Sequence, residues 1–200
     1  MLRLHYAPGT ISITVALTLE ETGTPYEPVR LDFSQGDQRS DAYLALNPKG
    51  RVPLLETPHG LLTESVAILE YIAPGLIPVD PFKAARMRET IQYLSSTMHV
   101  AHAHKMRGAR WATEAASFED MRGKVAENIA ASCAYLEDRL ALDPWVVDDQ
   151  FTLADPYLFL LMTWVPGDGV DRTAYPKLQA HFERMEARDS VKAVRSKGML

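Results

Sequence analysis

The sequence holds a single cysteine, Cys133, among its 200 residues. One cysteine cannot form a disulfide within the chain, which fits a reducing compartment. The N-terminus also lacks a charged segment followed by a long apolar stretch, so no signal peptide is expected. Both absences favour a cytoplasmic protein.

Long apolar runs and blocks of basic charge are missing too. No stretch of roughly 18 apolar residues occurs, so no membrane-spanning helix is expected. Lysine and arginine number 21 against 26 aspartate and glutamate residues, which gives a net charge of −5. Because the basic residues form no block, nucleic acid is not an expected partner. The hydrophobic content of 46% is ordinary for a globular protein with one large or two small domains.

The first 74 residues predict alternating strands and helices. Apolar and polar residues alternate over residues 2–6, as they do in a strand, and helical spacing follows over residues 12–22 up to Gly23. Further strands are predicted at 26–31, 52–56 and 61–63, with a weakly helical segment around Tyr43 and Leu44 and a helix at about 65–73. The predicted order is βαβαββα.

Residues 75–81 are expected to be a linker, because prolines and a glycine crowd this part of the sequence. Beyond it the strand pattern disappears. Apolar residues at helical spacing predict long helices over residues 82–110 and 121–140. A capping box at 152–155 opens an apolar helix, and an amphipathic helix is predicted at 175–187. Residues 82–200 are therefore expected to form an all-helical domain.

The most informative stretch is Asn-Pro-Lys-Gly-Arg-Val-Pro at residues 47–53, followed by Thr-Glu-Ser at residues 63–65. Val52, which precedes a proline, can offer its N–H and C=O to an extended peptide. Glu64 and Ser65 stand at a helix start, where free N–H groups, a hydroxyl and a carboxylate can bind a small zwitterion. Together the segments predict a receptor for a short peptide with an amino-acid head. The alternative is that residues 63–65 serve only as a helix N-cap.

These segments give the sequence a resemblance to the cytosolic glutathione S-transferases, nearest the bacterial beta class. The resemblance covers essentially the whole chain and rests on Tyr-Ala-Pro-Gly at 6–9, residues 47–53, Leu-Thr-Glu-Ser at 62–65 and Thr-Leu-Ala-Asp at 152–155. It implies a thioredoxin-like α/β domain over residues 1–74 followed by the all-α domain. It also implies glutathione as co-substrate and a homodimer as the usual assembly.

The resemblance further implies which residues bind glutathione. Val52 would pair its backbone with the cysteinyl part, ahead of Pro53, which is a cis proline in this family. Glu64 and Ser65 match the pair that binds the γ-glutamyl group. His102 matches a histidine that approaches the site in the beta class. The full predicted set is Arg51, Val52, Pro53, Glu64, Ser65, Ser95, His99 and His102.

Ser95, His99 and His102 fall on one stripe of the predicted helix 82–110, because they are spaced by four and three residues. A polar stripe beside an apolar face can line a cleft. Two other interpretations remain for the histidines. His102 could be a partly buried side chain satisfied by a backbone carbonyl. A metal site of His99, His102 and His104 lacks a carboxylate or thiolate at ligand spacing, so no metal is expected.

The sequence departs from the beta class in the turn after Gly9. The class carries a cysteine there, where this chain has Ile11. Cys133 falls on an apolar helix face and is expected in the core, so a mixed disulfide at the turn is excluded. A hydroxyl would have to stabilise the glutathione thiolate instead, as tyrosine or serine does in other classes. Thr10 and Ser12 are favoured, with Tyr6 next.

Each of these hydroxyls also has a structural interpretation. Thr10 or Ser12 could be the N-cap of the first helix, and Tyr6 could simply pack under the turn. Near the end of the helix predicted at 82–110, an adaptable apolar pocket for a small hydrophobic electrophile is expected, although ordinary packing would also explain its residues. The residues predicted to line it are Met106, Arg110 and Trp111.

The sequence favours a glutathione transferase that stabilises the glutathione thiolate and conjugates it to a small hydrophobic electrophile. The alternative is a non-catalytic module on the same fold, which binds glutathione or a protein partner without turnover. The missing turn cysteine permits this alternative. A thiol pKa lowered in the complex would distinguish the two, because only the enzyme requires it.

Overall fold

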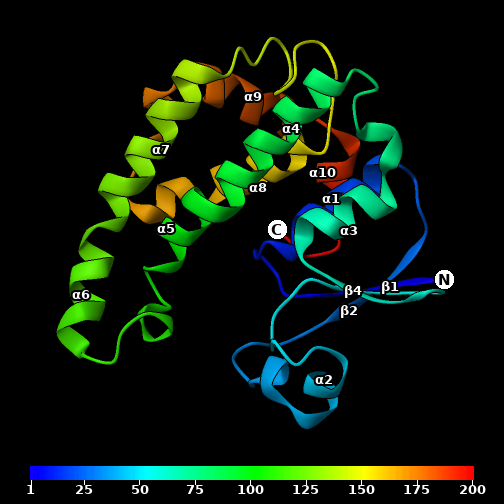
Figure 1. Ribbon diagram of the computed structural model, residues 1–200, viewed down its shortest axis with the longest axis vertical. Coiled ribbons are helices and arrows are strands. Elements are labelled where there is room, and N and C mark those ends of the chain that lie inside the picture. Colours follow the sequence, from blue (N-terminus) through cyan, green and yellow to red (C-terminus); the bar gives the residue numbers. More distant parts are fainter. The chain divides into compact units, whose positions relative to one another are not determined.

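The computed structural model describes residues 1–200, which form two compact units. The first unit consists of residues 1–77 and 186–200, and the second of residues 78–185. Figure 1 follows the chain from the N-terminus, in blue, to the C-terminus, in red. None of the helices is long and apolar enough to cross a membrane.

A four-stranded sheet forms the centre of the first unit, with the strand order β2-β1-β3-β4. Strand β1 (Leu2–Tyr6) runs parallel to β2 (Tyr26–Arg30) and antiparallel to β3 (Leu54–Thr57), which forms a hairpin with β4 (Gly60–Thr63). β3 begins at Leu54 rather than at the expected residue 52, since Pro53 has no N–H to give to a ladder.

Three helices cover one face of this sheet and one covers the other (Figure 1). α1 (Ser12–Glu21) is the crossover between the parallel strands, and it contacts α3 (Ser65–Ile72) and α10 (Asp189–Ser196). α2 (Asp41–Leu46) lies on the opposite face. The predicted order βαβαββα and the thioredoxin-like fold are confirmed.

The last residues of the chain return to the first unit. Arg188 and the Ser190 hydroxyl bond to the Glu21 carboxylate at the end of α1, the serine at 2.6 Å. Gly9 N–H donates to the carbonyl of Met199 at 2.9 Å. Residues 186–200 are expected from the sequence to belong to the helical domain, with no helix predicted beyond residue 187, whereas their contacts place them with the sheet.

The second unit is helical, as predicted. Its residues form no strand, only one isolated bridge between Val147 and Gln150. Its helices are α4 (Pro81–Tyr93), a π-helical turn (Leu94–Met98), α5 (His99–Ala103), α6 (Ala115–Gly123), α7 (Val125–Arg139), α8 (Ala154–Trp164) and α9 (Pro176–Glu186).

Two predicted helices are shorter than expected. The helix predicted over 82–110 ends at Ala103, and Gly108 lies so close to Phe118 that a Cβ would come within 2.8 Å of that ring. The helix predicted over 121–140 is two helices, α6 and α7, separated at Lys124. Gly123 immediately before the break is a weak helix former, which explains the interruption.

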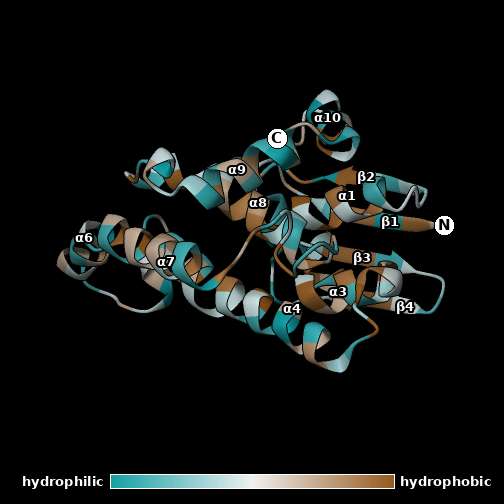
Figure 2. Ribbon diagram, turned by 90° about the horizontal axis from the view of Figure 1, so that it is seen from above, coloured by the Kyte–Doolittle hydropathy of each residue, from teal (hydrophilic) through white to brown (hydrophobic).

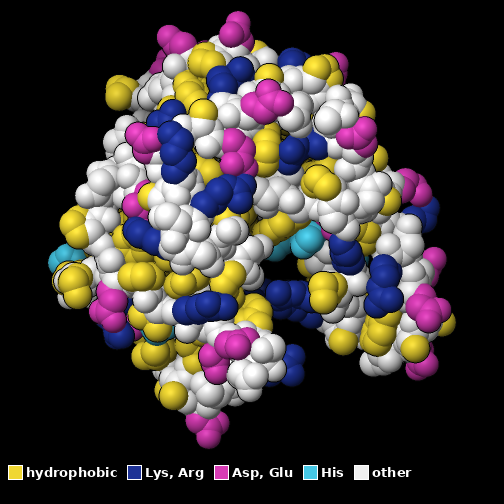
Figure 3. All heavy atoms as spheres, turned by 180° about the vertical axis from the view of Figure 1, so that it is seen from behind, with side chains coloured by type: hydrophobic (Ala, Val, Ile, Leu, Met, Phe, Trp, Pro, Cys, Tyr) yellow, Lys and Arg dark blue, Asp and Glu magenta, His cyan; other side chains and the backbone are white.

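α8 is the buried centre of the second unit, since its residues from Ala154 to Met162 are all buried, and Figure 2 colours the ribbon by the hydropathy of each residue. One half of its predicted capping box is present, since Thr152 N–H donates to Asp155 Oδ2 at 2.7 Å, whereas Thr152 Oγ1 accepts from Ala154 N–H at 3.3 Å rather than from Asp155 N–H. On the face of the molecule seen in Figure 3, acidic, basic and hydrophobic side chains are interspersed.

Candidate functional site

The predicted peptide-binding segments meet at one end of the sheet. The register pairs Leu54 with both His5 and Thr63. Val52, which lies two residues before Leu54, therefore emerges beside the residues that follow Thr63 and beside the turn that follows β1. Three separate stretches of sequence converge there by strand pairing alone.

The loop that carries Val52 is held by two hydrogen bonds to the carbonyl of the preceding residue, Arg51. Tyr43 Oη and Asn47 Nδ2 donate to the Arg51 carbonyl at 2.7 and 2.6 Å. Both donors are buried, whereas the Arg51 side chain is exposed. The predicted cis bond between Val52 and Pro53 is present. This arrangement fixes the Val52 backbone just outside the sheet.

Glu64 and Ser65 form the start of α3. Glu64 has a φ of 70°, a conformation that a non-glycine residue rarely adopts and that clusters at ligand sites. Glu64 occupies the N-cap position of this helix, as the alternative interpretation expects, but its side chain makes no capping hydrogen bond, so the first N–H groups of α3 lack a capping side chain. The Glu64 carboxylate is exposed and accepts a hydrogen bond from Lys49 Nζ at 2.6 Å, while Ser65 is buried.

The turn between β1 and α1 distinguishes the two favoured hydroxyls. Ser12 is fully buried, and its oxygen accepts a hydrogen bond from Ala7 N–H at 3.2 Å. Thr10 is half-buried; its hydroxyl donates to the Ala7 carbonyl at 2.8 Å and lies 2.7 Å from the Ser12 oxygen. Neither side chain caps α1, whose N-cap residue is Ile11 without a side-chain bond. Ser12 is thus enclosed within the turn, and Thr10 is the hydroxyl nearer to solvent.

Tyr6 is the last residue of β1, where its register partner is Arg30 of β2. Burial, the hydrogen bond to Glu20 and that carboxylate's charge raise the pKa of Tyr26, and nearby Tyr6 adds to this increase. Tyr6 itself is only 6% exposed. Its position fits the packing interpretation better than that of a thiolate donor.

The second unit gathers a different group of residues around His102. Its ring nitrogen Nδ1 lies 2.6 Å from Oδ2 of Asp168, whose side chain is 1% exposed. The ring stacks on Trp164 with centroids 4.4 Å apart, and His99 contacts the same indole at 5.2 Å. The partner of His102 is therefore a buried carboxylate, not the backbone carbonyl considered from the sequence.

Ser95 does not follow the helical spacing assumed for the stripe. It lies in the π-helical turn, where His99 N–H donates to the Leu94 carbonyl five residues back. Its hydroxyl donates to the Gln92 carbonyl at 3.1 Å. Because a π-turn is wider than an α-turn, the assumption of one continuous α-helical stripe is wrong here.

Asp168 and Trp164 are not identified by the sequence analysis. Asp168 is 66 residues from His102, and no local pattern links such distant positions. The Pro-Gly pair at 166–167 marks a turn after the apolar helix, which is the only signal near them.

The residues predicted to line the electrophile pocket lie in the loop after α5. Met106 is 85% exposed and Trp111 is 47% exposed, with the ring of His104 edge-on to Trp111 at 4.4 Å. Arg110 ends a short 3-10 helix and is exposed. The structure gathers no cluster of three or more metal-ligating side chains.

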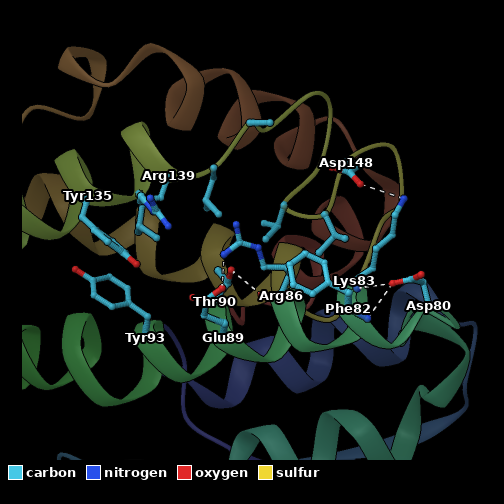
Figure 4. A pocket seen from close by; sticks show the side chains of 15 residues that line it. Asp80, Phe82, Lys83, Arg86, Glu89, Thr90, Tyr93, Tyr135, Arg139 and Asp148 are labelled. Atoms are coloured by element: carbon cyan, nitrogen blue, oxygen red, sulfur yellow. Dashed lines mark hydrogen bonds and ion pairs between the residues drawn. The ribbon is translucent and has the colours of Figure 1, made fainter.

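A cavity of about 550 Å³ lies elsewhere in the second unit, between α4, α7 and the chain after α7 (Figure 4). Tyr93 and Tyr135 pack against each other at one end of it, with ring centroids 4.5 Å apart. None of the residues predicted for the glutathione or electrophile site lines this cavity.

Cys133 is fully buried in α7, as expected. Burial, together with the charges of Asp168 and Glu137, raises the pKa of its thiol to about 12. Such a thiol stays protonated at neutral pH and is not a nucleophile.

Comparison with known proteins points in the same direction as this geometry. Residues 2–74 match the family model for the glutathione S-transferase N-terminal domain, and residues 93–189 match that for the C-terminal domain. Glutathione S-transferase GST-4.5 of Xanthomonas campestris is 31% identical over 202 aligned positions, 96% of each chain. Maleylacetoacetate isomerase of Pseudomonas aeruginosa is 31% identical over 184 positions, 87% of this chain and 85% of the relative. A crystal structure of a glutathione transferase homolog from Sulfitobacter, with bound glutathione, is 51% identical with a TM-score of 0.98, covering 100% of this chain and 99% of the other.

Proposed function

Because the chain belongs to the glutathione S-transferase family, we propose that it binds glutathione at the sheet end of the first unit and transfers it to a small hydrophobic electrophile. The observation that carries this proposal is the convergence of the Val52 loop, the start of α3 and the turn after β1. Each supplies a different part of what a thiol tripeptide needs.

Glutathione would lie along the Val52 backbone as an added strand. Val52 N–H and C=O would pair with the cysteinyl residue. The γ-glutamyl carboxylate would meet the Ser65 hydroxyl and the free N–H groups of α3, while its ammonium would meet Glu64. Lys49 Nζ donates a hydrogen bond to the Glu64 carboxylate. The glutathione ammonium would therefore bind this carboxylate beside Lys49 or displace the lysine from it.

The Thr10 hydroxyl is our candidate for the thiolate donor. To donate to sulfur it must release the Ala7 carbonyl, and the Ser12 hydroxyl lies 3.3 Å from the same carbonyl, ready to take its place. Lowering a thiol pKa by one unit requires about 1.4 kcal/mol of preferential thiolate stabilisation. One charge-assisted hydrogen bond of roughly 1.5–3 kcal/mol supplies that amount. No cysteine of the protein is needed.

The remaining contacts stay predictions. His102, His99, Ser95 and Arg51 are proposed as further glutathione contacts, in keeping with the resemblance to the beta class. Of these residues, His102 has a buried carboxylate, that of Asp168, as its partner. The electrophile is proposed to meet the exposed loop side chains Met106, Arg110 and Trp111.

We also propose a two-fold homodimer. Exposed aromatic side chains support it, since Phe82 is 71% and Tyr135 is 42% exposed beside the cavity of Figure 4. A two-fold interface uses the same surface on both copies, so such a patch can be covered by its own equivalent. Light scattering at several concentrations measures the mass directly, and a monomer at all of them would contradict the proposal.

Calorimetric titration with glutathione tests the binding part. We expect saturable binding to the unmodified protein, and Ser65→Ala to weaken it by about 1–2 kcal/mol because a hydrogen bond to a charged group is lost. Ser196→Ala, at an exposed serine bonded only within its own helix, is the control. Unchanged affinity in Ser65→Ala would remove this residue from the site.

A glutathione-dependent isomerase is the second candidate, favoured by the similarity to a maleylacetoacetate isomerase. An isomerase adds the thiolate and then expels it, so glutathione is not consumed. Loss of thiol during reaction with an aryl halide favours the transferase, and conversion of maleylacetoacetate at constant thiol favours the isomerase. Binding with neither reaction would favour the non-catalytic module.

A further inference from the structure

We propose that Asp168 is a positioning residue that holds His102 in a single tautomer, with the proton on Nδ1 and the lone pair of Nε2 left open as a proton acceptor. The geometry for this lies entirely within the second unit. The consequence for catalysis rests on the proposed function, whereas the tautomer itself does not.

The hydrogen-bond partners determine where the proton is. Nδ1 of His102 lies 2.6 Å from Oδ2 of Asp168, and the other carboxylate oxygen is 3.3 Å from Lys105 Nζ. A carboxylate only accepts hydrogen bonds, so a neutral imidazole at this distance must donate from Nδ1. Its second nitrogen then carries the lone pair.

The ring is held on its face as well as at its edge. It stacks on Trp164 at 4.4 Å with an interplanar angle of 23°, and the indole and the carboxylate come from one short stretch, residues 164–168. Lys105 donates to the Gly167 carbonyl in the same stretch. The stacking fixes the plane of the ring, and the Asp168 contact opposes a ring flip, which would replace Nδ1 by a carbon atom.

The unbonded Nε2 of His102 distinguishes the His102–Asp168 pair from a pair whose only role is to join two helices. The Asp168 side chain is 1% exposed, and burying a carboxylate costs free energy that an apolar contact would avoid. His102 retains 29% of its side-chain exposure, and its ring has no hydrogen-bond partner other than Asp168. A structural pair does not require an accessible lone pair, but a proton acceptor does.

The helix that carries His102 gives independent support. The π-helical turn Leu94–Met98 comes directly before α5, and such turns occur frequently at functional sites. The hydroxyls of Ser95 and Ser96, which lie in this turn, both donate to the carbonyl of Gln92 near the end of α4, at 3.1 and 2.7 Å. The hydrogen bonds from its own side chains therefore stabilise the irregular turn.

The proton balance of the proposed step is simple. A proton-bearing group of a substrate that reaches His102 would lose its proton to Nε2, which becomes N–H, and would keep the electron pair of the broken bond. The imidazolium formed is next to the Asp168 carboxylate, which compensates its charge. The charged neighbours are Asp168 and Lys105, and the Cys133 thiol nearby stays protonated.

Nitrogen-15 spectra of histidine-labelled protein test the tautomer directly, since the two ring nitrogens have distinct shifts in each form. At a pH where His102 is neutral, we expect its proton on Nδ1 in the unmodified protein. A dominant Nε2–H form, or rapid exchange between both forms, would overturn the proposal. This measurement needs no activity, so it stands even if the proposed function fails.

Asp168→Asn tests the consequence while preserving side-chain shape. We expect mixed His102 tautomers and a roughly tenfold loss of kcat, with KM for glutathione unchanged. Asp171→Asn, at an exposed aspartate whose side chain bonds only to Thr173, is the matched control and should change neither. A variant that loses thermal stability but keeps kcat and the single tautomer would show that Asp168 is structural.

Discussion

Thr10 and Ser12 differ in what their oxygens already bond, and this difference separates two residues that the sequence treats as equivalent. Ser12 is fully buried and accepts from Ala7 N–H, so it belongs to the turn itself. Thr10 is partly accessible and shares the Ala7 carbonyl with Ser12, so its proton can be redirected. Spacing along the chain could place both hydroxyls near the helix start but could not show which of them is enclosed.

Thr10→Val is expected to lower kcat/KM by about 10- to 100-fold, because a charge-assisted hydrogen bond of roughly 1.5–3 kcal/mol is lost from the thiolate. The valine keeps the shape of the side chain, so glutathione affinity should change little when calorimetry is done at a pH where the bound thiol is protonated, and should fall at a pH where it is ionised. Thr113→Val, at an exposed threonine outside the turn, serves as control. Full activity in Thr10→Val would exclude this hydroxyl as the donor.

Cys133→Ala is expected to retain transferase activity, because a thiol with a pKa raised to about 12 does not react at neutral pH. Some stability should be lost, since the sulfur is fully buried and its removal leaves a small cavity. Steady-state kinetics and thermal melting measure the two effects separately. Loss of activity without loss of folding would contradict the core assignment.

At the scale of elements, the helices and strands whose apolar pattern is local are those that the sequence predicts well. All four strands, α1, α3 and the start of α8 appear within a few residues of their expected bounds. The errors have two causes: the close approach of Gly108 to Phe118 is a tertiary contact, whereas the π-turn inside the helix from residue 82 and the break at Lys124 are local irregularities of the backbone. None of these features is encoded in apolar spacing.

The loop before β3 illustrates how an element supports the site. Tyr43→Phe removes one of two donors to the Arg51 carbonyl and should weaken glutathione binding by about 1 kcal/mol without unfolding the domain. Tyr71→Phe, at a 43% exposed tyrosine of α3, is the control. Calorimetry compares the two variants, and equal affinities would show that this clamp does not position Val52.

The attachment of α10 to α1 should depend on pH through Glu21. Burial raises the pKa of this carboxyl, but the hydrogen bonds from Arg188 and Ser190 outweigh it, so the pKa is lowered from 4.5. The stabilisation is therefore present above about pH 4.5 and is lost as pH falls through the folded-state value. Carboxyl groups titrate between about pH 5 and pH 3. Over this range the melting temperature should fall more steeply in the unmodified protein than in Glu21→Gln.

The exposed Glu119 provides the comparison for this titration. Glu119→Gln should follow the unmodified protein over the whole acid range. Parallel curves for the unmodified protein and Glu21→Gln would mean that the contact with Arg188 and Ser190 adds nothing to stability.

At the scale of the whole molecule, the two-unit organisation is evident from the sequence, but the path of the chain is not. Composition separates an α/β part from a helical part near residue 75, yet residues 186–200 return to the sheet-containing unit. The bond from Gly9 to Met199 and the pairing of His102 with Asp168 join positions far apart in the chain. Such pairs are products of folding, and a single sequence carries no local signal for them.

The most direct test of the account is the thiol pKa of bound glutathione, followed by ultraviolet difference spectroscopy across pH. We predict a thiol pKa at least about one unit below the roughly 8.5 of an ordinary thiol, and a return toward that value in Thr10→Val. Glutathione that binds with an unshifted thiol would contradict the transferase and leave a protein that only holds the peptide.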